Sequence, residues 1–168
     1  MKLPRTLRLD ASDTVIFDRA AAPGEWAVPG GFAFWECDPA RLGGKQRQAF
    51  RAGFLGLGSF GWSTLVEVAE ASEAEHAAAL GSLAAHIAAT YGAPDAAAAQ
   101  AAAAEELAFA ASLCEHPPGT VLALSRSLEE GAVRERFRTL HRRDQAPVFA
   151  ILPDGQEEGP MRPDLTRL

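Results

Sequence analysis

Residues 45–69 read KQRQAFRAGFLGLGSFGWSTLVEVA and predict a short helix, a glycine-rich turn and a strand. Phe50 and Phe54 are four residues apart, so they share one helix face. The glycines that follow are expected to end this helix. Residues 63–69 then fit a strand with Thr64, Val66 and Val68 on one face. This order favours an α+β domain with a mostly antiparallel sheet.

The glycines of this stretch also fit the letters of a nucleotide-binding fingerprint. Gly56, Gly58 and Gly61 match G-x-G-x-x-G, which holds a pyrophosphate when a strand precedes it and a helix follows it. Here the predicted helix comes before the glycines and the strand comes after them. We therefore expect these glycines to serve the backbone, by allowing positive φ angles and close approach to bulky rings.

Length and composition indicate one soluble domain. The chain has 168 residues, of which 48% are hydrophobic, and a formal net charge of −6. We expect a single α+β domain over residues 1–155 and a C-terminal tail over residues 156–168. The negative charge argues against nucleic-acid binding. Two cysteines, no apolar leader and no segment suited to a bilayer predict a cytoplasmic protein without a membrane contact.

Two further helices complete the predicted helical part of the fold. Ser72 and Glu75 form a capping box that opens a helix ending at Gly92, and Asp95 lies at the start of the next helix. Because the connection between them is short, we expect an antiparallel helix hairpin. With the helix at residues 45–54 this makes three helices. Strands are expected at residues 5–9, 15–17, 26–36, 63–69, 120–125 and 147–152, in a sheet of about five to seven strands.

Residues 128–141 fit two different structures. A capping box from Ser127 to Glu130 and the apolar residues after it are typical of a helix. The same segment also fits a β-hairpin, with Gly131 in the left-handed conformation at the turn. We favour the hairpin, because a glycine in the first turns of a helix costs about 1 kcal/mol.

Aromatic residues are concentrated in one part of the chain. Eight of the thirteen Phe, Trp and Tyr residues lie between positions 26 and 62. They mark either the densest part of the core or a pocket lined by rings. Core packing is the expected role, because each ring buries a large area.

Arg134, Arg136 and Arg138 form a strip of positive charge if their segment is a strand, because alternate residues share one face. In an acidic protein, this strip suits an acidic surface on a partner protein. The alternative is a solvated edge strand whose charges prevent edge-to-edge pairing. We expect a protein partner, and the sequence leaves homo-oligomerisation open.

Four residues are candidate metal ligands: Glu73, His76, Cys114 and His116. The predicted helix hairpin would bring the first two towards the last two, and these residue types suit zinc. The alternative is that Glu73 and His116 interact with helix dipoles and that Cys114 packs in the core. Because no pair has the spacing of a zinc site, we predict no cofactor. A small metal- or thiol-dependent enzyme is the alternative to a non-catalytic protein.

Three segments of the chain together resemble a family of uncharacterised bacterial proteins, a domain of unknown function found mainly in proteobacteria. They are RTLRLDASDTVIFDRAAAPGEWAV (5–28), KQRQAFRAGFLGLGSFGWSTLVEV (45–68) and ASLCEHPPGTVLALSRSLEEG (111–131). The resemblance extends to about Leu140. It implies an accessory role beside formate-dehydrogenase-type molybdenum and iron–sulfur oxidoreductases, and it supplies no catalytic residues. We therefore expect a non-catalytic cytoplasmic accessory or binding protein.

Overall fold

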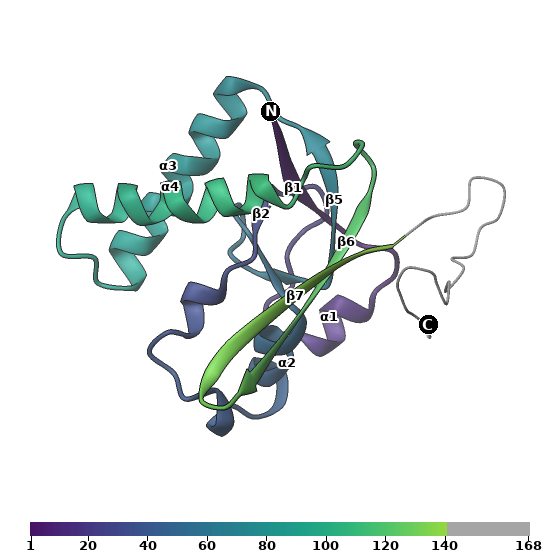
Figure 1. Ribbon diagram of the computed structural model, residues 1–168, viewed down its shortest axis with the longest axis vertical. Helices are drawn as coiled ribbons and strands as arrows, with labels where there is room; N and C mark the ends of the chain where they lie inside the picture. Colours follow the sequence, from purple (N-terminus) through teal and green to yellow (C-terminus); the bar gives the residue numbers. More distant parts are fainter. Residues whose placement is uncertain (141–168) are drawn as a thin grey trace, which may run out of the picture.

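A computed structural model describes residues 1–140, and its strands form two antiparallel sheets (Figure 1). The larger sheet has the strand order β1-β5-β6-β7, and the smaller has the order β2-β3-β4. The strands are β1 (Lys2–Leu7), β2 (Ala27–Val28), β3 (Phe54–Gly56), β4 (Trp62–Ser63), β5 (Leu65–Glu70), β6 (Val121–Glu129) and β7 (Ala132–Leu140). The helices are α1 (Ser12–Ile16), α2 (Gly44–Ala52), α3 (Glu73–Thr90), α4 (Ala96–Ser112) and the 3₁₀-helices η1 (Gly31–Phe34) and η2 (Pro39–Arg41).

The expected α+β mixture is present, but the strands form two sheets where one was expected. Residues 63–69, predicted as one strand, divide at Thr64. Ser63 pairs with Phe54 in the smaller sheet, whereas Leu65 begins β5 in the larger one. Asp13 holds the division in place, because its carboxylate accepts from the Thr64 hydroxyl at 2.6 Å and from the Thr64 N–H at 3.2 Å.

The number of helices also differs from the expected three, because residues 15–17 do not form a strand. Helix α1 covers most of this segment and makes four α-helices in the described part of the chain. Local hydrogen bonds favour the helical turn. The Asp10 carboxylate accepts from the Ser12 N–H at 2.8 Å, and the Thr14 hydroxyl donates to the Ala11 carbonyl at 2.6 Å. Three apolar residues are too short a run to outweigh these bonds.

Helices α3 and α4 begin where the sequence predicts. The capping box of Ser72 and Glu75 is formed, and the Asp95 carboxylate accepts from the Ala98 N–H at 2.7 Å. Figure 1 shows the two helices crossing obliquely, so they pack together without forming the simple antiparallel hairpin that was expected. Buried alanines such as Ala99 and Ala103 let the helices approach closely where they meet.

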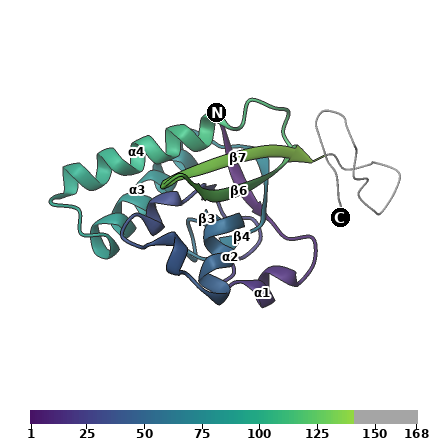
Figure 2. The same cartoon turned by 60° about the horizontal axis from the view of Figure 1, so that its bottom comes forward.

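The hairpin prediction for residues 128–141 is confirmed as far as Leu140. β6 and β7 pair from Val121↔Leu140 to Glu129↔Ala132. Glu130 and Gly131 form the turn with φ angles of 54° and 80°, the conformation that two-residue hairpin loops prefer. β5 pairs with β6 only over residues 121–123. Residues 124–137 therefore extend beyond β5 as a two-stranded segment, which we call the distal arm and which passes over α2 (Figure 2).

Two clusters of buried apolar side chains form the core. One lies between the α3–α4 pair and residues of β1, β2 and β3, and includes Leu3, Val28, Leu55, Leu83 and Leu107. The other packs against the inner face of the larger sheet, and includes Phe54, Val66, Val68, Cys114, Leu122 and Leu124. Within residues 1–140 no helix has the length and apolar character needed to span a membrane. The strand expected at residues 147–152 and the tail at residues 156–168 lie outside the described residues.

Candidate functional site

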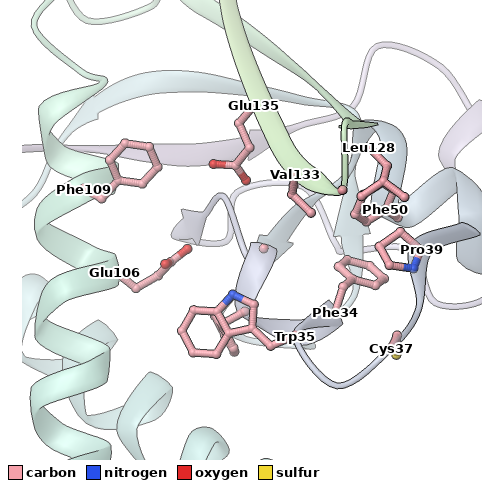
Figure 3. Close-up of a pocket in the computed structure, with 13 residues that line it drawn as sticks. Phe34, Trp35, Cys37, Pro39, Phe50, Glu106, Phe109, Leu128, Val133 and Glu135 are labelled. Carbon is pink, nitrogen blue, oxygen red and sulfur yellow. The ribbon is translucent and has the colours of Figure 1, made fainter.

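A pocket of about 510 Å³ lies between the distal arm, helix α4 and the segment that contains η1 and η2 (Figure 3). Its polar side chains are Cys37, Glu106 and Glu135. Its apolar walls are formed by Phe32, Phe34, Trp35, Pro39, Phe50, Phe109, Leu128 and Val133. Apolar walls with few polar groups are typical of binding pockets, so this is the candidate functional site of the described chain.

The aromatic residues between positions 26 and 62 serve both as core and as pocket wall. Phe54 is fully buried, and Phe50 packs edge-on against Phe34 with the ring centroids 5.4 Å apart. Trp35, in contrast, is 79% exposed. The strand expected over residues 26–36 ends at Val28, because Gly30 has a φ of 79° and turns the chain into η1. This turn places the aromatic residues of η1 at the pocket.

A buried arginine anchors the distal arm to the rest of the fold. Arg126 is 2% exposed, and its Nε donates to the Glu135 carboxylate at 2.7 Å. Its Nη1 donates to the carbonyls of Phe50 and Gly53, at 2.9 and 3.2 Å, and its Nη2 donates to the carbonyl of Pro29. Burial lowers the pKa of Arg126, and the charge and hydrogen bond of Glu135 oppose this change. The guanidinium therefore satisfies carbonyls at the C-terminal end of α2.

Glu106 faces the pocket from α4, and its Oε2 accepts from the Gly30 N–H at 2.8 Å. Burial raises the pKa of Glu106; the Gly30 N–H and Arg126 lower it, and the Glu135 carboxylate raises it further, with a net increase. One peptide unit lies between Glu106 and Arg126 and is hydrogen-bonded to both. Its carbonyl belongs to Pro29 and accepts from Arg126, whereas its N–H belongs to Gly30 and donates to Glu106.

The glycine-rich turn binds a carboxylate of the protein itself. Oε1 of Glu25 accepts from the N–H groups of Gly58 and Ser59, each at 2.8 Å, and Oε2 accepts from the Ala22 N–H at 2.6 Å. A Cβ atom at Gly56 would lie 2.5 Å from Oε1 of Glu25 and would displace this carboxylate. A Cβ atom at Gly61 would lie 2.7 Å from the backbone carbonyl of Ala20, so glycine is required at that position. The turn that matches the nucleotide fingerprint thus directs these two N–H groups to Glu25. The expectation of positive φ angles is wrong for Gly56, Gly58 and Gly61. Close approach to a ring occurs at Gly53, where a Cβ atom would lie 2.8 Å from Cε3 of Trp62.

The predicted arginine strip lies on one face of β7. Arg134, Arg136 and Arg138 are all exposed, on the opposite face from Glu135, which lines the pocket. Arg136 forms an ion pair with Glu129 at 2.9 Å. Because β7 is at the edge of the larger sheet, the geometry suits both partner docking and protection of an edge strand. Docking at the strip stays a prediction.

The sequence contains four candidate metal ligands: Glu73, His76, Cys114 and His116. Within residues 1–140 no group of three or more His, Cys, Asp or Glu side chains could hold a metal ion. The backbone of His116 does lie beside the start of β1, where its carbonyl accepts from Lys2 Nζ at 2.6 Å. Cys114 is 1% exposed and packs in the core.

We expect Cys114 to react slowly with thiol reagents. Burial raises its pKa to about 11, so the thiolate that attacks such reagents is scarce at neutral pH. Cys37 is exposed at the pocket and is expected to react readily. Mass spectrometry after iodoacetamide treatment should show one modified thiol in the native protein and two after unfolding. Fast modification of a Cys37→Ser variant under native conditions would contradict the burial of Cys114.

The described residues form a mixed fold of helices and strands, with two antiparallel sheets and an aromatic pocket beside the distal arm. A family model, "Family of unknown function (DUF6505)", matches residues 1–157, and the chain belongs to this family. No curated protein and no solved structure matches the chain. The resemblance to a family of unknown function is thereby confirmed, and the expected link to molybdenum enzymes stays a prediction.

Proposed function

We propose that this protein is a non-catalytic accessory protein that binds a partner protein through the distal arm and the pocket beneath it. The observation that supports this proposal is the clustering of exposed apolar side chains. Seven large apolar residues are exposed in residues 1–140, and four of them line the pocket: Trp35, Phe109, Leu128 and Val133. Apolar side chains exposed together on a surface are typical of protein–protein contact sites.

Trp35 is the side chain most suited to anchor a partner. Tryptophan is among the residues that contribute most binding energy at protein interfaces, and this one is largely exposed. Leu128 and Val133 are directly opposite each other in the hairpin, close to its turn, and extend the apolar lining of the pocket to that end of the distal arm. A partner seated on Trp35 would therefore also contact the tip of the distal arm.

Affinity purification with three full-length baits tests this function. We expect Trp35→Ser to weaken partner binding by roughly thirtyfold, the effect of losing about 2 kcal/mol at an interface anchor. Val15→Ser is the matched control, because Val15 is 66% exposed but lies on α1, away from the pocket. Equal recovery of all bound proteins by wild type and Trp35→Ser would contradict the proposal.

A fourth bait tests whether a partner protein docks on the arginine strip as well as at the pocket. Changing Arg134, Arg136 and Arg138 together to Ser should reduce recovery of a partner that docks on the strip, and the wild-type contact should weaken as salt increases. Unchanged recovery and salt dependence would show that the strip is a solvated edge. For the captured protein we propose a cytoplasmic component of a molybdenum or iron–sulfur oxidoreductase system, which mass spectrometry would identify.

A further inference from the structure

We propose that the pocket binds an arginine or lysine side chain carried by an apolar segment of the partner protein, with Glu106 as acceptor and Trp35 as the stacking surface. This inference rests on the proposed function, because it states what the docked partner must contribute. Glu106 reaches the pocket from α4 and Glu135 reaches it from β7. Figure 3 shows both carboxylates pointing into the space between these two elements.

The carboxylates at the pocket outnumber the buried cation that neutralises them. Arg126 places a buried guanidinium beside the pocket, and its nitrogens donate to Glu135 and to main-chain carbonyls. Glu106 receives one backbone N–H, from Gly30, and no ion-pair partner lies within 4.0 Å of it in residues 1–140. Two carboxylates therefore share one buried cation. A positively charged group that enters from solvent would compensate the second carboxylate.

The rings at the pocket suit the same kind of ligand. A guanidinium or ammonium group is attracted to the face of an aromatic ring, most strongly to tryptophan. Trp35 is held in place by an edge-on contact with Phe32, with centroids 6.3 Å apart, while most of its surface stays exposed. Phe34 and Phe109 provide further ring surface in the pocket. The planar guanidinium of arginine can stack on a ring and donate to a carboxylate at the same time.

The size of the apolar surface favours a polypeptide over a free amine. A volume of about 510 Å³ exceeds what one side chain fills, and the exposed apolar residues continue to the tip of the distal arm. Leu128 and Val133 at that tip would contact apolar residues on either side of the cationic one. A segment with a basic residue between apolar residues matches this arrangement in both charge and shape.

Selection of short random peptides displayed on phage tests this proposal with the full-length protein as bait. We expect enrichment of sequences with arginine or lysine between apolar residues. The best peptide should bind Glu106→Gln at least about tenfold more weakly than wild type, as for loss of a charge-assisted hydrogen bond. Glu105→Gln is the matched control, because Glu105 is exposed on the same helix and does not line the pocket. It should bind as wild type does.

Replacing the basic residue of that peptide with citrulline identifies the carboxylate it contacts. The replacement should weaken binding to wild type by about tenfold and should have little effect on Glu106→Gln, since coupled groups are not additive. Peptides that depend on Trp35 but show no preference for a basic residue would overturn this inference and leave the proposed function standing. Peptides with no dependence on Trp35 would count against both.

Two further outcomes would also overturn the inference by naming another occupant. Arginine methyl ester binding as tightly as the peptide would assign the pocket to a small amine. A dimer of the wild-type protein in analytical ultracentrifugation that dissociates in Glu106→Gln would assign it to a second copy of this chain. A monomer that binds the peptide and not the amine supports the partner segment.

Discussion

Replacing Arg126 with methionine is expected to lower the free energy of unfolding by about 3–5 kcal/mol, because removal of one partner from a buried ion pair leaves the other charge uncompensated. Methionine keeps the apolar stem but loses every donor. Glu135 would lose its 2.7 Å ion pair, and the carbonyls of Phe50, Gly53 and Pro29 would lose the guanidinium. The distal arm is expected to separate from α2 as a result.

Urea denaturation at neutral pH measures this effect. Arg134→Met is the matched control, since Arg134 is on the same hairpin but exposed, and it should change the stability by no more than about 0.5 kcal/mol. Adding Glu135→Gln to Arg126→Met should restore part of the loss, because it removes the uncompensated carboxylate. If Arg126→Met and Arg134→Met unfold at the same urea concentration, Arg126 does not anchor the arm.

Replacing Glu25 with glutamine is expected to destabilise the protein by about 1–3 kcal/mol at pH 7. The amide keeps one acceptor oxygen for Gly58 and Ser59, but its NH₂ group would face the N–H of Ala22, which is also a donor. This loss would loosen the glycine-rich turn between β3 and β4.

The pH dependence identifies the charge of Glu25 as the cause. Burial raises the pKa of Glu25, but hydrogen bonds from Ser59, Gly58 and Ala22 outweigh it, and the pKa is lower than usual. The ionised form is therefore favoured in the folded state, and its stabilisation is complete above the ordinary glutamate pKa of 4.5 and lost as the pH falls through the folded value.

The difference in stability between wild type and Glu25→Gln should thus shrink as the pH falls from 7 towards 3, since both side chains become neutral. Urea midpoints of the two proteins at several pH values measure this difference, and other titrating groups cancel in the comparison. Glu105→Gln removes an exposed carboxylate from α4 and is the control for the loss of one negative charge. A difference in stability that stays constant with pH would mean that the geometry of the glutamine amide, and not the loss of charge, causes the destabilisation.

The features that the sequence predicts well depend on residues close together in the chain. The capping box of Ser72 and Glu75 spans one helical turn, and the hairpin turn at Glu130 and Gly131 depends on two neighbours. Such local structures can be predicted from the sequence, because the interactions that stabilise them lie within the segment itself. The same holds for the end of α3, where Gly92 has a φ of 66°.

The features that were missed depend on contacts between distant residues. Thr64 divides the sheets because of Asp13, which is 51 residues away, and Glu106 meets Gly30 across 76 residues. No local pattern shows these pairs. Arg126 did leave a signal, because it lies on the same face of β6 as the buried residues Leu122 and Leu124. A charge at the next inward position of a strand indicates a partner of opposite charge, which here is Glu135, a residue that lines the pocket.

The peptide unit between Pro29 and Gly30 also allows ligand binding in the pocket to be followed by spectroscopy. Its N–H donates to Glu106 and its carbonyl accepts from Arg126, so a change of charge on either side chain alters the polarisation of one amide. In a nuclear magnetic resonance spectrum of isotope-labelled protein, the Gly30 amide signal would shift when a cation reaches Glu106. The chemical shift of the Gly30 amide therefore measures whether the pocket is occupied, without a dye and without a substitution in the pocket.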